Sequence, residues 1–218
     1  TGGHIMANLE KEFRVETSAH HCHLTQETLD GLFGKGFDLD KYVRFPLSQH
    51  GQYCSIVRVD IEVDGKDGKK HRLNGLSILG PARKYNQFEI SLTDARALHI
   101  DAPVRQSGHT ENSVGCTVIS KDAKTGKEIA RVELKDGVVA QKRHIHINPT
   151  QAEELGVKDG EIVAVDIKSP IDRHVIFDDV VIRVNPTFDL SMHLDTDESN
   201  AAGLNGKETT GHLVEIKR

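Results

Sequence analysis

Two His-x-His pairs are the part of this sequence best suited to chemistry. One pair is His21 and His23, and the other is His144 and His146. Because side chains at i and i+2 point to the same face of a strand, each pair presents two imidazoles together. Such a pair is half of a site for a borderline-soft divalent ion, zinc above all. One pair alone is as often a chance exposed motif, but two pairs at strand-to-helix junctions favour a metal site.

Two further residues can complete such a metal site, and a third can bind an anion beside it. His193 lies in the acidic run LSMHLDTD, and Glu89 lies between Phe88 and Ile90 in a strand-like run. A buried, unpaired carboxylate is costly, so a cation beside Glu89 is physically attractive. Arg83 follows a Gly-Pro-Ala turn and offers a guanidinium for bidentate capture of phosphate or carboxylate. Taken alone, His193 is more often a hydrogen-bonded core residue and Arg83 a surface cation.

The elements that must position these residues are mostly short strands. Alternating, β-branched runs between turns predict strands over Tyr53–Val63, His71–Leu79, Val114–Ser120, Glu128–Leu134, Val138–Gln141, Glu161–Ile167 and Val180–Val184. Short helices are predicted over Thr25–Phe33, Ser91–Leu98 and Asn148–Leu155, the last with Asn148 as N-cap and Gly156 as its C-terminal stop. Many short strands with few helices predict a mainly β fold, a barrel or a sandwich.

Three segments of the chain resemble one another. HCHLTQETLDGLFGKG, EISLTDARALHI and HIHINPTQAEELGVKDG each run strand, cap residue, short helix and turn. The similarity indicates an internal duplication into two related β-rich halves, residues 7–140 and 141–218, between which strands can be exchanged. Residues 1–5, TGGHI, are interpreted as an expression scar.

Composition excludes several classes of partner. With a net charge of −5 and no tryptophan, the chain is poorly equipped to follow a phosphate backbone or to stack on bases, so no nucleic acid is expected. No apolar run approaches the roughly 18–20 residues that span a bilayer, so no membrane is expected. The three widely spaced cysteines are interpreted as free thiols in a reducing compartment, and a cytoplasmic location is expected.

A cupin-type metal motif is the runner-up interpretation. His21, His23, Glu27 and Gly34 match the spacing of its core. Cupins place that carboxylate on a strand facing the metal, whereas Glu27 lies in a helix-like stretch. A cupin-like enzyme with a single metal is therefore ranked second.

Taken in order, the motifs resemble the PduL-type phosphate acyltransferases, or phosphotransacylases. The resemblance covers nearly all of Ser18–Leu204 and rests on SAHHCHLTQETLDGLFGKG, ILGPARKYNQFEIS, PVRQSG, KRHIHINP and LSMHLDTDESNAAG. It implies two similar small β-barrel domains capped by short α-helices, with a dinuclear zinc site in the cleft between them. It also implies an acyltransferase (EC 2.3.1 class) that interconverts a short-chain acyl-CoA plus phosphate with acyl phosphate plus coenzyme A.

The resemblance assigns roles to individual residues. The zinc ligands it implies are Glu89, His144, His146 and His193 for one ion and His21 and His23 for a second, more open ion. The catalytic residues it implies are Arg83, which would hold phosphate, and Ser107, at the reaction centre, while Arg83 and Arg143 would bind the cofactor. The sequence departs from the family at His20, Gln106 and Cys22, the last an additional soft atom inside the first pair, without losing an expected ligand.

A zinc-dependent phosphate acyltransferase is thus the leading interpretation. A non-catalytic zinc- or CoA-binding barrel protein is the alternative from another class. A homodimer stays open, as does packaging with the shell or lumen proteins of a bacterial microcompartment. Met6–Thr17 shows no clear apolar stripe of the kind that such packaging peptides carry, which favours the free cytoplasm.

Overall fold

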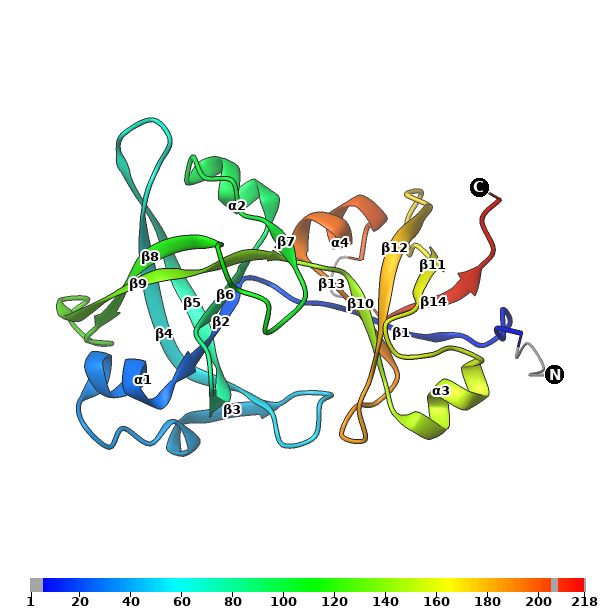
Figure 1. Cartoon of the computed structure of the whole chain (residues 1–218), viewed down its shortest axis with the longest axis horizontal. Coiled ribbons are helices and arrows are strands. Elements are labelled where there is room, and N and C mark those ends of the chain that lie inside the picture. The colour runs from blue at the N-terminus through cyan, green and yellow to red at the C-terminus, as the bar shows by residue number, and fades with distance from the viewer. Residues whose placement is uncertain (1–5, 205–207, 218) are drawn as a thin grey trace. The chain divides into compact units, whose positions relative to one another are not determined.

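The computed structural model describes residues 6–204 and 208–217 and divides into two compact units (Figure 1). Among the described residues, unit 1 contains 6–18, 48–50 and those from 142 onward, and unit 2 contains 19–47 and 51–141. The suspected expression scar, residues 1–5, lies outside this description. No helix in the described ranges is long and apolar enough to cross a membrane.

Unit 2 is a β-barrel with short flanking elements. Its elements are β2 (His21–Thr25), α1 (Gln26–Phe33), the 3-10 helix η1 (Leu39–Tyr42), β3 (Val43–Pro46), β4 (Tyr53–Asp64), β5 (Lys70–Arg83), β6 (Gln87–Ile90), α2 (Leu92–Ala97), β7 (Val104–Arg105), β8 (Val114–Lys121) and β9 (Glu128–Gln141). The pairings run β4-β5-β2-β6-β9-β8, and β8 pairs back to β4, which closes the ring. β3 pairs with β4, and β7 pairs with β9.

Unit 1 is also a closed barrel. Its elements are β1 (Phe13–Thr17), β10 (His144–Ile147), α3 (Pro149–Leu155), β11 (Ile162–Ile167), β12 (Val175–Val184), β13 (Ser191–Leu194), α4 (Thr196–Ala202) and β14 (Thr209–Val214). The strand order is β1-β13-β10-β12-β11-β14, and β14 pairs with β1. The expectation of a mainly β chain, with two similar small barrels and few, short helices, is confirmed.

Both barrels are built around a central antiparallel pair of short strands. In unit 2 the pair is β2 and β6, which lead into α1 and α2. In unit 1 the pair is β10 and β13, which lead into α3 and α4. Each of the four strands also has a parallel neighbour: β5, β9, β12 and β1, respectively. The duplication seen in the sequence is therefore a duplication of this strand-and-helix arrangement.

A polar cap residue joins each central strand to its helix. The caps are Thr25, Ser91, Asn148 and Asp195, and each side chain accepts a hydrogen bond from a backbone N–H of the first helical turn. These bonds satisfy N–H groups that a helix leaves without an internal partner. The predicted capping of Asn148–Leu155 is confirmed, including the stop at Gly156, which adopts a left-handed conformation with φ 74°.

Strand alternation divides the residues of the central pairs between two faces. Cys22 and Leu24 of β2 enter the apolar core of unit 2, and Ile145 and Ile147 of β10 enter that of unit 1. Successive side chains of a strand point to opposite faces, so the histidines between these residues lie on the other face. The packing of the cores thereby fixes the direction of each His-x-His pair.

The N-terminal strand lies in a different unit from the one expected under the predicted division into residues 7–140 and 141–218. β1 pairs with β13 and β14 and thus belongs to unit 1, as does Gln49, which forms an isolated bridge with Phe188. The last change of unit lies between Gln141 and Lys142, one residue after the predicted boundary. A strand is thus exchanged between the halves, a possibility that the sequence left open.

Candidate metal centres

The register of the central strand pairs brings the metal-ligating residues together. In unit 2, β6 places Glu89 opposite His21 and Gln87 opposite His23. In unit 1, β13 places His193 opposite His144 and Ser191 opposite His146. Each barrel therefore presents a His-x-His pair with a third ligand opposite its first histidine. The two sets occupy corresponding positions of the duplicated arrangement.

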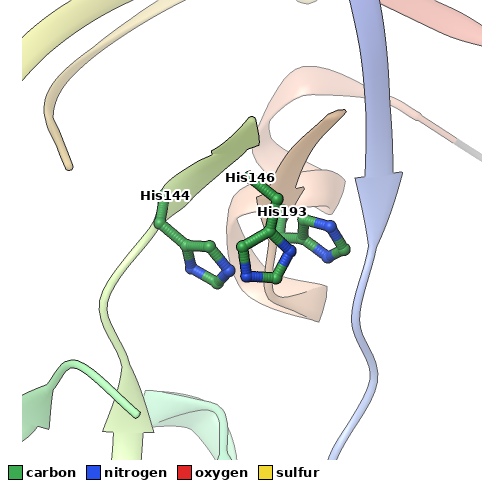
Figure 2. A group of neighbouring side chains, drawn as sticks. All are labelled: His144, His146 and His193. Carbon is green, nitrogen blue, oxygen red and sulfur yellow. The ribbon is translucent and has the colours of Figure 1, made fainter. Parts of the chain in front are cut away.

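The set in unit 1, named the histidine triad, consists of His144, His146 and His193 (Figure 2). All three are buried, and each offers a ring nitrogen within 4.8 Å of those of the other two. The ring centroids lie 4.4 Å apart for His144 and His146, and 5.1 Å apart for His144 and His193. Three buried imidazoles converging on one point are a donor set that suits zinc.

Neighbouring groups orient the rings of the histidine triad. Nδ1 of His144 donates to the main-chain oxygen of Lys142 at 2.9 Å, which leaves Nε2 with the lone pair that a metal needs. The amide of Gln49 lies 2.6 Å from Nδ1 of His146, and the hydroxyl of Ser191 lies 2.9 Å from Nε2 of His193. Such outer contacts hold a ligand set in place before an ion binds.

The set in unit 2, named the mixed triad, consists of His21, His23 and Glu89. Its ligand atoms lie within 4.8 Å of one another, and all three residues are buried. Nε2 of His21 contacts Oε2 of Glu89, and Nδ1 of His21 donates to the main-chain oxygen of Ala19 at 2.8 Å. Burial alone would lower the pKa of His21, but the charge and hydrogen bond of Glu89 outweigh it, so this pKa is raised.

The position of Glu89 within unit 2 is set by strand pairing. The family resemblance grouped this carboxylate with His144, His146 and His193, and that grouping stays a prediction. In the structure, antiparallel pairing of β6 with β2 makes Glu89 the direct neighbour of His21. The carboxylate therefore completes the mixed triad of unit 2.

A chain of polar contacts extends from the mixed triad to Arg83. Nε2 of Gln87 donates to Oε1 of Glu89 at 2.7 Å and lies 3.3 Å from the hydroxyl of Ser107. That hydroxyl lies 3.2 Å from the phenol of Tyr85, which accepts from Nη1 of Arg83 at 3.1 Å. The two predicted catalytic residues are thus linked to the mixed triad through two residues that the sequence did not single out.

The guanidinium of Arg83 is anchored by neutral groups. Besides Tyr85, it donates through Nη2 to Oε1 of Gln52 at 2.8 Å. Among the described residues, no carboxylate forms an ion pair with it. Its positive charge is therefore held in a fixed orientation without being neutralised, which suits it to an anionic ligand.

Arg143, the other predicted cofactor residue, is held within unit 1. Nε donates to the main-chain oxygen of Asp178 at 2.7 Å, and Nη1 forms an ion pair with Glu198 at 2.9 Å. The guanidinium also lies 5.2 Å from the ring centroid of Phe177. These contacts engage Nε, Nη1 and the face of the guanidinium.

Two residues noted in the sequence lie away from the buried histidines' ligand positions. Cys22, noted as an additional soft atom, lies in the core of unit 2 on the face opposite the histidines, where burial raises the pKa of its thiol well above the ordinary range. Glu27, the carboxylate of the cupin alternative, is exposed on α1 instead of facing a metal from a strand. The cupin interpretation is therefore wrong.

Some of the residues that contact the ligands could have been identified from the sequence, and others could not. Gln87 lies two residues before Glu89, so strand alternation places both on one face, and that spacing could have identified it. Tyr85 lies two residues before Gln87 and so continues the same alternation, although it is outside β6. Gln49 comes from a loop far from His146 in the chain, and no local pattern indicates their contact.

Comparisons with known proteins agree with this picture. A family model described as phosphate propanoyltransferase matches residues 14–205. A phosphate propanoyltransferase of Listeria monocytogenes is 43% identical over 208 residues, which cover 95% of this chain and 90% of that protein. The phosphate propanoyltransferase of Thermotoga maritima is 44% identical over 202 residues, covering 93% and 87% of the two chains. That of Enterococcus faecalis is 39% identical over 210 residues, covering 96% and 92%.

Proposed function

The chain belongs to the phosphate propanoyltransferase family, and from this premise we propose that it transfers a short acyl group between coenzyme A and phosphate at a zinc-dependent site. The reaction interconverts acyl-CoA plus phosphate with acyl phosphate plus coenzyme A. The observation that carries the proposal is the pair of buried ligand sets at corresponding positions of the two barrels, one of them linked by polar contacts to Arg83.

The histidine triad and the mixed triad are the proposed zinc ligands. Imidazole nitrogens and a carboxylate oxygen are donors that zinc binds well, and in both sets these donors are buried and lie close together. His144 and His21 each direct Nδ1 to a main-chain oxygen, so Nε2 is the ring nitrogen that faces the ligand set. When bound, zinc supplies a Lewis acid that polarises a carbonyl and stabilises a thiolate.

Arg83 is proposed to bind the phosphate that attacks the thioester. A guanidinium matches the geometry of two phosphate oxygens, and Tyr85 and Gln52 restrict its rotation. Holding phosphate beside the acyl carbonyl makes the attack effectively intramolecular. The same positive charge stabilises the oxyanion that forms on the carbonyl oxygen.

Ser107 is proposed to contact the reacting groups as a hydrogen-bond partner. Its hydroxyl lies between the phenol of Tyr85 and the amide of Gln87, so its orientation is set by both. In the proposed reaction the phosphate oxygen bonds to the acyl carbon, and the bond from that carbon to the CoA sulfur breaks. Because phosphate attacks the acyl carbon directly, no acyl group is carried on the enzyme, and the sulfur leaves as a thiolate.

Arg143 is proposed as a contact for coenzyme A. Its hydrogen bond to Asp178 and its ion pair with Glu198 use Nε and Nη1. Nη2 is therefore the proposed donor to an anionic group such as a phosphate of the cofactor. The physiological partners in this proposal are acyl-CoA, phosphate and acyl phosphate.

The test is release of free thiol from acetyl-CoA or propionyl-CoA by the purified protein, with and without phosphate. We expect release that requires phosphate, is lost after chelation and returns with zinc. Release without phosphate would instead identify a thioesterase. Zinc-replete protein that binds coenzyme A but does not turn over either substrate would favour the non-catalytic alternative.

A further inference from the structure

A third group of metal-ligating side chains lies on the surface of unit 2. Asp67 is in the turn between β4 and β5, His71 is the second residue of β5, and His99 follows α2. Each offers one ligand atom within 4.8 Å of those of the other two. We name these three residues the turn cluster. It shares no residue with the histidine triad or the mixed triad.

The ligand atoms of the turn cluster face one another. Nε2 of His71 lies 2.9 Å from each carboxylate oxygen of Asp67, and Nδ1 of His99 lies 3.9 Å from Oδ2 of the same residue. The two imidazole rings stack, with centroids 4.6 Å apart and planes inclined by 24°. Two protonated rings so close would repel each other, whereas one divalent cation can bind both rings and the carboxylate.

Backbone contacts hold the turn cluster in this arrangement. The N–H of Lys66 donates to the main-chain oxygen of His99 at 2.8 Å and so ties the turn to the end of α2. The N–H of Lys69 donates to Oδ1 of Asp67 at 3.2 Å, which fixes the carboxylate. A Cβ on Gly65 would lie only 2.4 Å from that same oxygen. Any larger residue at position 65 would therefore displace the carboxylate or the ring of His71 from this arrangement.

His99 carries a left-handed backbone at the end of α2. Its φ is 55°, in a region that histidine enters more often than most non-glycine residues. This conformation ends α2 and accompanies the stacking of its ring on His71. The backbone of the helix end thereby holds the ring of His99 beside the other two ligands.

We propose that the turn cluster is a surface site for one divalent transition-metal ion such as Zn²⁺. Two imidazole nitrogens and one carboxylate suit this class of ion and leave coordination positions for water. The exposed fractions of the side chains are 28% for Asp67, 22% for His71 and 52% for His99, so the site is open to solvent. We therefore expect the turn cluster to bind metal more weakly than the buried triads. Metal can then enter and leave it while the buried triads stay loaded.

Zinc binding to protein whose buried sites are already loaded tests this proposal. After desalting, ZnCl₂ is titrated into the wild-type chain, and bound zinc is measured by equilibrium dialysis and native mass spectrometry. We expect one additional ion per chain, and at least tenfold weaker binding of that ion in His71→Gln and in His99→Asn. Asparagine is chosen at position 99 because it tolerates a left-handed backbone.

His174→Gln is the matched control. Nε2 of His174 lies 2.7 Å from Oδ1 of Asp166, an exposed His–Asp pair outside the turn cluster. We expect this variant to bind the additional zinc like the wild type, and all three variants to keep the zinc of the buried triads and the rate of thiol release. Histidine NMR spectra should show shifts of His71 and His99 on zinc addition.

Three results would overturn the proposal: no additional zinc in the wild type, equal binding in all variants, or loss of binding in His174→Gln. Any of them would mean that Asp67 and His71 form only an ion pair that holds the turn. His99→Asn keeps the test valid if His71→Gln unfolds, because the side chain of His99 is half exposed.

Discussion

His21 and His144 occupy corresponding positions in the two barrels and are oriented in the same way. Nδ1 of each donates to the main-chain oxygen of the residue two positions earlier, Ala19 at 2.8 Å and Lys142 at 2.9 Å. A main-chain oxygen only accepts, so this contact fixes the tautomer of each ring and directs the lone pair of Nε2 to the ligand set. The two barrels thus share both the candidate metal-ligating histidine and the main-chain contact that orients its ring.

The first prediction is that the two triads lose zinc independently. Glu89→Gln keeps the size of the side chain but removes the charge beside His21, and His193→Gln removes a ring from the histidine triad. We expect each variant to lose one zinc ion per chain after desalting, and the double variant to lose both. Metal content measured by plasma mass spectrometry checks this. Loss of all zinc from either single variant would show that the sites are not independent.

The second prediction concerns Gln87, which is fully buried between the mixed triad and Ser107. Its Oε1 accepts from the N–H of Gly108 at 2.8 Å, while its Nε2 donates to Glu89. Gln87→Leu would leave the N–H of Gly108 and the buried carboxylate of Glu89 without this contact, and a buried unsatisfied group costs about 1–3 kcal/mol. We expect a loss of about 1–3 kcal/mol in the free energy of unfolding, measured in urea, together with slower thiol release.

Ser107→Ala is the comparison for Gln87→Leu. It removes the hydroxyl but leaves the bond of Gln87 to Glu89 intact. We expect a smaller loss of stability, within about 1 kcal/mol, and a clear loss of turnover. A Gln87→Leu protein with wild-type turnover would argue against a positioning role for this residue.

Much of the local structure could be predicted from the sequence, because it depends on short-range rules. Strand alternation identified the His-x-His pairs, and cap residues identified three of the helices. The same rule identifies α4, since Asp195 and Glu198 form a capping box of the same kind as Asn148 and Gln151, but the acidic run around His193 was interpreted only as surroundings of a ligand.

Other features depend on contacts between distant residues and could not be predicted in this way. The partner of Glu89 is set by the register of β6 on β2, and a shift of register would place a different residue opposite His21. The place of β1 depends on pairing with β13, which follows it by more than 170 residues. Likewise, Gln49 reaches His146 only after the barrel of unit 1 has formed.

The third prediction is a loss of stability at alkaline pH caused by Cys116. Burial in the core of unit 2 raises the pKa of this thiol from 9.0 to about 12. The folded state therefore favours the neutral thiol. This contribution is complete below the pKa of the unfolded chain and is lost progressively as the pH rises from that value to the folded pKa of about 12. We expect the free energy of unfolding to fall above about pH 8.5, by up to about 1.4 kcal/mol per pH unit from this group.

Urea unfolding of the wild type and of Cys116→Ala between pH 6 and pH 9.5 measures this effect. The two curves should run parallel at pH 6–7, where the thiol is neutral in both states, and converge above pH 8.5. Curves that stay parallel throughout would exclude Cys116 as the source of the alkaline loss. Cys22, whose thiol pKa burial also raises, accounts for a remaining slope in the variant.

The fourth prediction separates phosphate binding from metal binding at Arg83. Arg83→Ala removes the guanidinium that Tyr85 and Gln52 orient but touches no residue of the two triads. Loss of one charged donor to a developing oxyanion typically lowers the rate by about 10²–10³-fold, so we expect kcat/KM for phosphate to fall by at least that factor while zinc content stays at the wild-type value. Arg83→Lys should recover only part of the rate, because an ammonium keeps the charge but not the two-point geometry. Thiol-release kinetics at varied phosphate, measured beside the metal content of the same samples, distinguish the outcomes. Loss of zinc in Arg83→Ala would mean that Arg83 supports the mixed triad instead of binding substrate. Unchanged kinetics would mean that Arg83 does not belong to the site.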